Sequence, residues 1–144
     1  MTVHQISVFL ENRAGQLSEI TQVLAQNGID MRAISIAETS DYGVLRLIVD
    51  RPQQATTLLL EHGFILSMTP VTVVAVPDHP GGLAPVLQLL AEANIDIEYM
   101  YSLFTHTDGQ AYMVFRVSDD ESFTATLKSH GINPVGTEDL GIQG

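Results

Sequence analysis

The sequence has 144 residues, of which 45% are hydrophobic and 16% are charged, a composition typical of a folded protein rather than a disordered chain. Its 17 acidic and 6 basic residues give a formal net charge of −11. This balance argues against binding to nucleic acid or to an anionic membrane, because both rely on clustered lysine and arginine. The absence of cysteine excludes disulfides, zinc–thiolate sites, iron–sulfur clusters and thiol catalysis.

Neither the start of the chain nor its most apolar stretch has the pattern of a targeting or membrane segment. Residues 1–5 lack the basic-then-apolar layout of a secretion signal. The longest uncharged apolar stretch, residues 64–76, contains Ser67, Pro70 and two threonines, and it is too short to span a bilayer. We therefore expect a cytoplasmic protein.

The chain contains an internal duplication. The sixteen residues from Gly15 to Asp30 align with those from Gly81 to Asp96, and seven of the sixteen pairs are identical. Unrelated segments would share about one identical pair. Further along, residues 62–64 match residues 130–132 at an offset larger by two. Such self-similarity predicts two structural repeats.

Short strand-like runs alternate with helical periodicity in the first repeat. Residues 6–10 predict a strand, and the apolar residues from Leu17 to Leu24 then recur at helical spacing as far as Gly28, a suitable left-handed C-cap. Two further strands are expected over residues 29–38 and 44–50, joined by a turn-rich segment. Pro52 opens a second helix, which ends at His62-Gly63 and leads into a last strand containing Pro70.

The second repeat shows the same order. A strand over residues 72–76 is followed by a helix, in which Leu83, Val86 and Leu90 recur at helical spacing and Asn94 is the C-cap residue, and then by strands over 95–105 and 111–117. Ser118 and Glu121 fit a capping box at the start of the second helix. A last strand containing Pro134 is expected at a sheet edge.

The order β-α-β-β-α-β, found twice, predicts an α+β protein with two ferredoxin-like domains, each an antiparallel four-stranded sheet with both helices on one face. We place the domains at residues 1–71 and 72–144. Each has about 70 residues and so only a thin core of its own. We therefore expect the two copies to pack rigidly, with the bare sheet face covered by the other copy or by a second chain.

The loop between the first strand and the first helix of each repeat is the candidate binding element. Pro85 is tolerated only in a first turn, so the helix is expected to start near Gly81 and to leave the N–H groups of Gly81, Gly82 and Leu83 free. Such an N-terminus favours a carboxylate by about 0.3–1 kcal/mol. The alternative interpretation is an ordinary Asn or Asp helix cap followed by a glycine turn.

The residues of these loops resemble a known family. The run Asp78-His-Pro-Gly-Gly-Leu83, continued through Ala91 to Asn94-Ile-Asp-Ile97, is similar to the ACT domain, a small-molecule-sensing module of amino-acid metabolism. The first repeat matches with Asn12 in place of the Asp and Ala14 in place of the Pro. The resemblance covers nearly the whole chain. Residues 96–101 further resemble short stand-alone proteins of two ACT domains that carry no catalytic domain.

The resemblance implies that ACT units pair and that ligands bind where the glycine loop of one unit meets the second strand of its neighbour. An amino acid would place its carboxylate on the helix N–H groups and its ammonium on Asn12 or Asp78 and on strand carbonyls. Because the first loop lacks the proline, we expect the two pockets to bind unequally. The ligand-binding residues expected on this basis are Asn12, Arg13, Ala14, Gly15, Gln16, Leu17, Ile29, Asp30, Met31, Asp78, His79, Pro80, Gly81, Gly82, Leu83, Ile95, Asp96 and Ile97.

Other polar residues are weaker candidates. The five histidines include no pair at metal-ligand spacing; His62 and His130 are expected at helix C-termini, and His79 is a possible ligand contact. Asp119, Asp120 and Glu121 fall in a first helical turn, where acids are simply stabilising. No apolar neighbour is expected to raise a pKa there, and Glu98 has no evident acid–base partner. We therefore expect no catalytic residue, metal or cofactor.

The favoured function is that of a non-catalytic regulatory protein, a homodimer of two-ACT-domain chains that binds an amino acid at an ACT–ACT interface. The alternative is a regulatory subunit that acts by contact with an amino-acid biosynthetic enzyme and has no ligand of its own. Residues 73–144 carry a net charge of −8, against −3 for residues 1–72. This asymmetry is either a well-solvated exterior or an acidic face for a basic partner enzyme.

Overall fold

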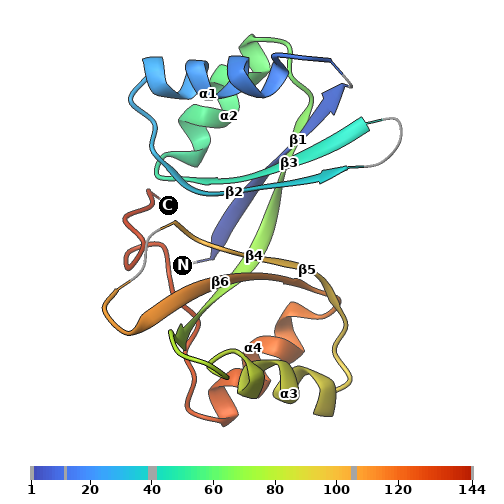
Figure 1. Ribbon diagram of the computed structural model, residues 1–144, viewed down its shortest axis with the longest axis vertical. Coiled ribbons are helices and arrows are strands. Elements are labelled where there is room, and N and C mark those ends of the chain that lie inside the picture. Colours follow the sequence, from blue (N-terminus) through green and yellow to red (C-terminus); the bar gives the residue numbers. More distant parts are fainter. Residues whose placement is uncertain (1, 12, 39–41, 105–106, 144) are drawn as a thin grey trace. The chain divides into compact units, whose positions relative to one another are not determined.

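The computed structural model describes residues 2–11, 13–38, 42–104 and 107–143, and the chain separates into two compact units (Figure 1). The first unit comprises His4–Thr69 with Gly141–Gly144, and the second comprises Met1–Val3 with Pro70–Leu140. They carry the first and second sequence repeats, respectively. No helix within the described ranges combines the length and the apolar character needed to cross a membrane.

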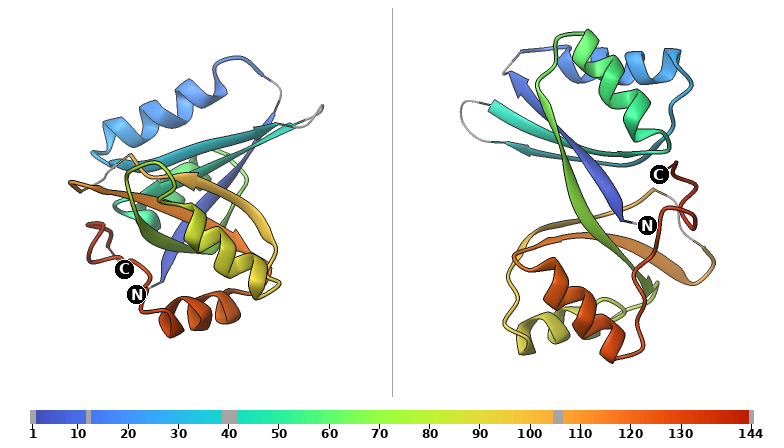
Figure 2. Two further views of the ribbon diagram at one scale, coloured as in Figure 1. Left: turned by 60° about the horizontal axis from the view of Figure 1, so that its bottom comes forward. Right: turned by 180° about the vertical axis from the view of Figure 1, so that it is seen from behind.

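The first unit has the expected β-α-β-β-α-β order. Its strand order is β2-β3-β1-β4, and the β1–β3 and β2–β3 pairs are antiparallel, with Leu47 of β3 opposite both Ile6 and Ile34. Helices α1 and α2 cover one face of this sheet (Figures 1 and 2). The ferredoxin-like prediction is confirmed. The elements are β1 (Val3–Glu11), α1 (Gln16–Gln26), β2 (Met31–Glu38), β3 (Tyr42–Val49), α2 (Pro52–Glu61) and β4 (Leu66–Pro77), which continues into the second unit.

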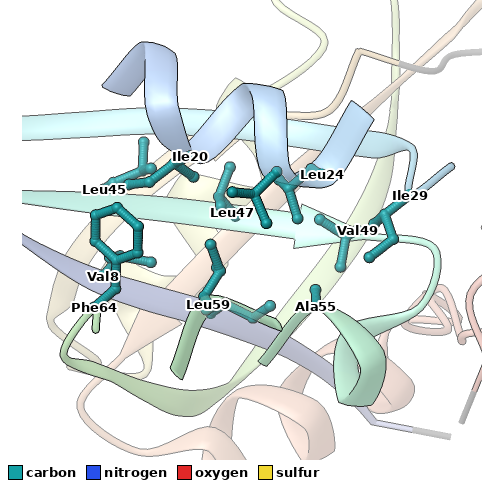
Figure 3. Close-up of a cluster of buried hydrophobic side chains, with 12 residues drawn as sticks. Val8, Ile20, Leu24, Ile29, Leu45, Leu47, Val49, Ala55, Leu59 and Phe64 are labelled. Atoms are coloured by element: carbon teal, nitrogen blue, oxygen red, sulfur yellow. The ribbon is translucent and has the colours of Figure 1, made fainter. Parts of the chain in front are cut away.

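Apolar side chains from both helices and from the sheet form the core of the first unit (Figure 3). Ile20 and Leu24 of α1 and Leu59 of α2 are fully buried against strand residues such as Leu45 and Leu47. The helical spacing of these residues therefore sets the buried face of each helix. Gly28 follows α1 with φ +66°, the left-handed conformation expected at a helix C-cap.

The second unit repeats the arrangement with the strand order β4-β6-β5 and with α3 and α4 on one face (Figure 1). Its core contains Phe115 and Phe123 in an edge-on contact, with ring centroids 5.4 Å apart. Asn94 ends α3 with φ +57°, so it takes the role of Gly28 as expected. The elements are α3 (Ala84–Glu92), β5 (Ile97–Ser102), β6 (Gln110–Val117) and α4 (Asp120–Ser129).

The last strand of the second repeat is reduced to a single pair of residues. Among the described residues, Val135 pairs with Val73 of β4 as an isolated bridge, and residues 137–141 form turns. Pro134 has no N–H with which to extend the ladder. In the first repeat, by contrast, Leu66 and Met68 continue as strand and pack against the core.

The N-cap of α4 lies one residue later than predicted. Asp119, not Ser118, caps the helix, because its carboxylate accepts the Ser122 N–H at 3.0 Å. The Ser118 hydroxyl instead accepts the Asp96 N–H at 3.2 Å, just before β5. Asp50 does the same in the first unit, where its carboxylate accepts the Asp30 N–H at 2.9 Å. A contact to a residue distant in sequence therefore decides which side chain caps the helix.

Asp119→Ala is expected to destabilise the second unit at pH 7 and to do so less at about pH 3. The Ser122 N–H, followed by its hydroxyl, donates to the carboxylate and holds the pKa of Asp119 below its ordinary value. The stabilisation is therefore complete above the ordinary pKa of aspartate and is lost as the pH falls through the lower folded one. Urea unfolding at both pH values measures it, with Glu121→Gln as the control from the same turn. A loss that stays constant with pH would contradict this role.

Candidate functional site

The glycine loop of the second unit is a tight turn that precedes α3. Pro80 and Gly81 occupy its two central positions, and the Gly82 N–H donates to the His79 carbonyl at 3.0 Å. Gly81 has φ +81°, which a type II turn requires at its second central residue. Because this turn comes first, α3 begins at Ala84. The predicted start near Gly81 and the free Gly82 N–H are therefore wrong.

Gly81 and Gly82 serve different purposes in this turn. A Cβ on Gly82 would lie 1.9 Å from the Pro77 carbonyl oxygen, so the close approach of backbone to backbone admits only glycine. A Cβ on Gly81 would meet nothing within 4 Å. Asp78, His79, Pro80 and Gly81 are exposed, whereas Gly82 is buried. The loop is thus fixed on its inner side and open to solvent at Gly81.

The loop of the first unit is held by a side chain instead. Gln16, at the start of α1, is only 6% exposed, and its Oε1 accepts the Glu11 N–H at 2.7 Å. Gly15 has φ +85° and open space where a Cβ would lie. Arg13 and Ala14 are exposed, Leu17 is half-buried, and Asn12 lies outside the described residues.

A cavity of about 250 Å³ adjoins the loop of the first unit and includes Gln16 in its lining. Phe9 and Tyr42 form part of its wall, with ring centroids 6.3 Å apart and about half of each side chain exposed. Of the predicted binding residues that the structure describes, only Gln16 lines this cavity. Sequence reasoning did not identify the aromatic pair, because Phe9 and Tyr42 come from strands whose register only the fold defines.

Helices α1, α2 and α3 begin without a side-chain cap, whereas Asp119 caps α4; of the three, α1 and α3 follow the glycine loops. Among the described residues, no acceptor contacts the N–H groups of Leu83 and Ala84 at the start of α3. These groups carry the partial positive charge of the helix N-terminus. Chemically, the two glycine loops therefore present uncapped N–H groups beside exposed backbone, an arrangement suited to a carboxylate.

The predicted strand residues lie away from the loops within each unit. Ile29 and Ile95 are buried, and the N–H groups of Asp30 and Asp96 already bond to Asp50 and Ser118. Eleven residues of α1, about 16 Å of helix, separate the loop from Met31 in the first unit. Neither unit alone brings its own loop and its own strand start together.

His62, His79 and His130 lie where the sequence places them, whereas His106 is outside the described residues. His62 and His130 end α2 and α4, and the Nδ1 of each lies within 2.9 Å of the carbonyl four residues earlier, Leu58 or Thr126. His79 is exposed in the glycine turn, with its Nδ1 2.9 Å from the Pro80 carbonyl. Within the described part of the chain, no three histidine or acidic side chains gather as a metal ion would require.

The environment of Asp120 differs from the prediction that no pKa is raised in the first turn of α4. Burial raises the pKa of Asp120, Arg116 opposes this with Nη1 at 3.3 Å, and the charges of Glu98 and Asp119 raise it further. Its Oδ1 is buried with no hydrogen-bond partner among the described residues. The sequence could not reveal this, because the burial depends on how α4 packs on β6. Asp120 lines neither the 250 Å³ cavity nor the glycine turn.

Two β-α-β-β-α-β units in tandem, each with a glycine turn before its first helix, define a pair of ACT domains. The family model described as an ACT domain pair matches residues 1–141, and the chain belongs to this family. The resemblance stated from the loop residues is thus confirmed. A comparison with curated proteins finds no match.

Solved structures show the same architecture. Protein BT0572 from Bacteroides thetaiotaomicron is 38% identical, with a TM-score of 0.90 over 98% of this chain and 96% of that one. The ligand-free regulatory subunit of aspartate kinase from Thermus thermophilus is 18% identical, with a TM-score of 0.66 over 90% and 91% of the two chains. The same subunit from Thermus flavus is 17% identical, with a TM-score of 0.56 over 90% and 93%. The last two likenesses concern the fold alone.

Proposed function

We propose that this chain is a non-catalytic regulatory protein that binds an amino acid. The ligand would lie where the glycine loop of one ACT unit faces the start of the second strand of a neighbouring unit. These walls are residues 12–17 and 78–83 on the loop side and residues 29–31 and 95–97 on the strand side. We infer that the protein is a homodimer, because ACT units pair in this family. We also infer that it acts in the cytoplasm.

One observation carries the proposal. Both glycine loops lead into helices that no side chain caps, and both leave open space at their left-handed glycine. A carboxylate can approach this backbone without a steric obstacle and accept hydrogen bonds from the uncapped N–H groups. The turn at Pro80-Gly81 is the more rigid of the two, since Ala14 stands where the proline would be. This difference supports unequal binding at the two loops.

Calorimetry with each of the twenty amino acids tests this proposal. We expect at least one to release or absorb heat and to raise the melting temperature, since a ligand at 100 times its Kd stabilises the folded state by about 2.7 kcal/mol. If no amino acid produces heat or a thermal shift, the proposal is wrong.

A matched pair of variants locates the site. Gly81 and Gly131 lie in the same unit, have φ of +81° and +75°, and leave the same open space for a Cβ. Gly81→Ala and Gly131→Ala therefore carry a similar backbone strain, about 1–2 kcal/mol each. We expect only Gly81→Ala to weaken binding, because its methyl group would occupy the approach to α3. Equal affinity of the two variants would exclude the second loop.

A second candidate is a subunit that regulates an amino-acid biosynthetic enzyme by contact, without a ligand of its own. Two solved structures with this fold are those of regulatory subunits of aspartate kinase. The charge of −8 on residues 73–144 suits a basic partner surface. Affinity capture from native lysate separates the two candidates. A stoichiometric enzyme partner together with silent calorimetry would favour the second.

A further inference from the structure

The second unit contains a cavity of about 390 Å³ between β4 and α4, apart from the glycine loops. We call it the α4 cavity. Its wall combines Val73 and Val135, from the isolated bridge, with Thr124 and Lys128, one turn apart on α4. Asn133 and Gly136 of the segment after α4 also line it, as do Thr2 and Val3 near the start of the chain. Its volume falls in the range of small-molecule sites.

Comparison of the two repeats explains why the cavity exists. At the offset of 68 residues that aligns His62 with His130, Thr124 corresponds to Thr56 and Gly136 to Met68. In the first unit Met68 packs against the core, and its Sδ accepts the Thr56 hydroxyl at 3.4 Å. In the second unit a glycine stands at the methionine position, so no side chain fills the space beside Thr124. The last strand is also reduced to the bridge at Val135.

The charge of the cavity also differs from its surroundings. Lys128 is the only lysine of the chain, and it corresponds to Leu60 of the first repeat. None of the described residues that line the cavity is acidic, although 17 acidic residues give the chain a net charge of −11. Acidic residues lie just outside the lining: the Oδ2 of Asp139 accepts the Gly136 N–H at 3.3 Å, and Asp120 and Glu121 lie in the first turn of α4, before Thr124. A single cation beside threonine hydroxyls and valine side chains suits a ligand that carries one negative charge on a small aliphatic group.

We propose that the α4 cavity binds a small aliphatic carboxylate. Lys128 pairs with the carboxylate, the Thr124 hydroxyl and the Asn133 amide offer hydrogen bonds, and the half-buried Val135 contacts the hydrocarbon part. Val73, which is only 1% exposed, belongs to the wall beneath the ligand. The site lies outside the glycine loops and does not rest on amino-acid binding there, because its ligand needs no ammonium group. An amino acid would bring a positive charge next to Lys128.

The test uses 3-methylbutanoate as the probe and inorganic phosphate as the comparison anion. Valine methyl NMR of the full chain reports the site directly, and we expect saturable shifts at Val73 and Val135 with 3-methylbutanoate at millimolar concentration. Lys128→Leu and Gly136→Met introduce the first-repeat residues at these positions. We expect at least tenfold weaker binding for Lys128→Leu, through loss of the charge, and no binding for Gly136→Met, through filling of the cavity.

Controls keep the result interpretable. Ala125→Met adds the same side chain to an exposed position of α4 outside the cavity and should bind like the wild type. Gly136 lies outside the left-handed glycines, so methionine brings no φ strain there. Should Gly136→Met fail to fold, Lys128→Leu still decides through the same methyl shifts. The proposal is overturned if the wild type shows no saturable shift, if Lys128→Leu binds as tightly as the wild type, or if phosphate binds in place of 3-methylbutanoate.

Discussion

Replacement of Gly82 by alanine is expected to destabilise the second unit by about 3 kcal/mol, the upper end of the range for overpacking. The new Cβ would lie 1.9 Å from the Pro77 carbonyl oxygen and 3.2 Å from that of His79. Both obstacles are backbone atoms, so no side-chain rotation relieves the overlap. Pro77 ends β4 opposite Gln110 of β6, and the Asp78 N–H bonds to the Gly109 carbonyl at 2.9 Å. Because these bonds hold the backbone on both sides of the turn, the overlap can be relieved only by breaking the turn itself.

Loss of this turn would also abolish amino-acid binding at the second loop if the proposed site is correct. Urea unfolding followed by circular dichroism gives the stability change, and calorimetry gives the affinity. Gly81→Ala is the neighbouring control: its methyl group has open space, so it should lose about 1–2 kcal/mol from backbone strain alone. If Gly82→Ala proves as stable as the wild type, the backbone contact between Gly82 and Pro77 is not required for this fold.

The sequence was sufficient for the elements and their order, because those follow from local periodicity. The apolar spacing from Leu17 to Leu24 predicts α1, and Gly28 and Asn94 end their helices in the left-handed conformation as expected. The short β-turn at Pro80-Gly81 also follows from local chemistry, although the prediction placed the start of the helix there instead. In each case the deciding interaction lies within a few residues.

The features that sequence reasoning missed depend on contacts between residues far apart in the chain. Ser118 is a good N-cap by residue type, yet its hydroxyl bonds to Asp96, 22 residues earlier. Burial of the first turn of α4 raises the pKa of Asp120, and the charge of Glu98 raises it further, although Arg116 opposes both. Such partners are fixed by tertiary packing, which overrides local preference.

The candidate site is predictable only in part for the same reason. The loops are recognisable from Gly15 and Gly81, but the structure keeps each loop at the other end of its helix from the strand start of the same unit. The proposal therefore takes the second wall of the pocket from a neighbouring unit. Local patterns in one repeat contain no information about which strand that is.

The core of the second unit is expected to depend on Phe123 more than on any single polar contact described above. Phe123 is fully buried and meets Phe115 edge-on, with centroids 5.4 Å apart, in a cluster with Leu90 and Leu127. Phe123→Ala should lower the free energy of unfolding by about 3–5 kcal/mol, the range for Phe-to-Ala changes that leave a cavity. In a small unit such a loss is a large part of the total stability.

The first repeat gives this experiment its internal reference. Ala55 stands at the position of Phe123 and Leu47 at that of Phe115, and both are fully buried in the first unit. Alanine therefore fits this helix position in the first unit, where the surrounding core residues fill the space that Phe123 occupies in the second. Phe104→Ala, at a residue that is 55% exposed, serves as the control and should change stability by less than about 0.5 kcal/mol. Because the chain has no tryptophan, far-ultraviolet circular dichroism in urea is the suitable measurement.

A loss below about 1 kcal/mol for Phe123→Ala would contradict this expectation. It would mean that Leu90 and Leu127 move to fill the cavity left by the phenyl ring, so that the second core tolerates alanine as the first does at Ala55.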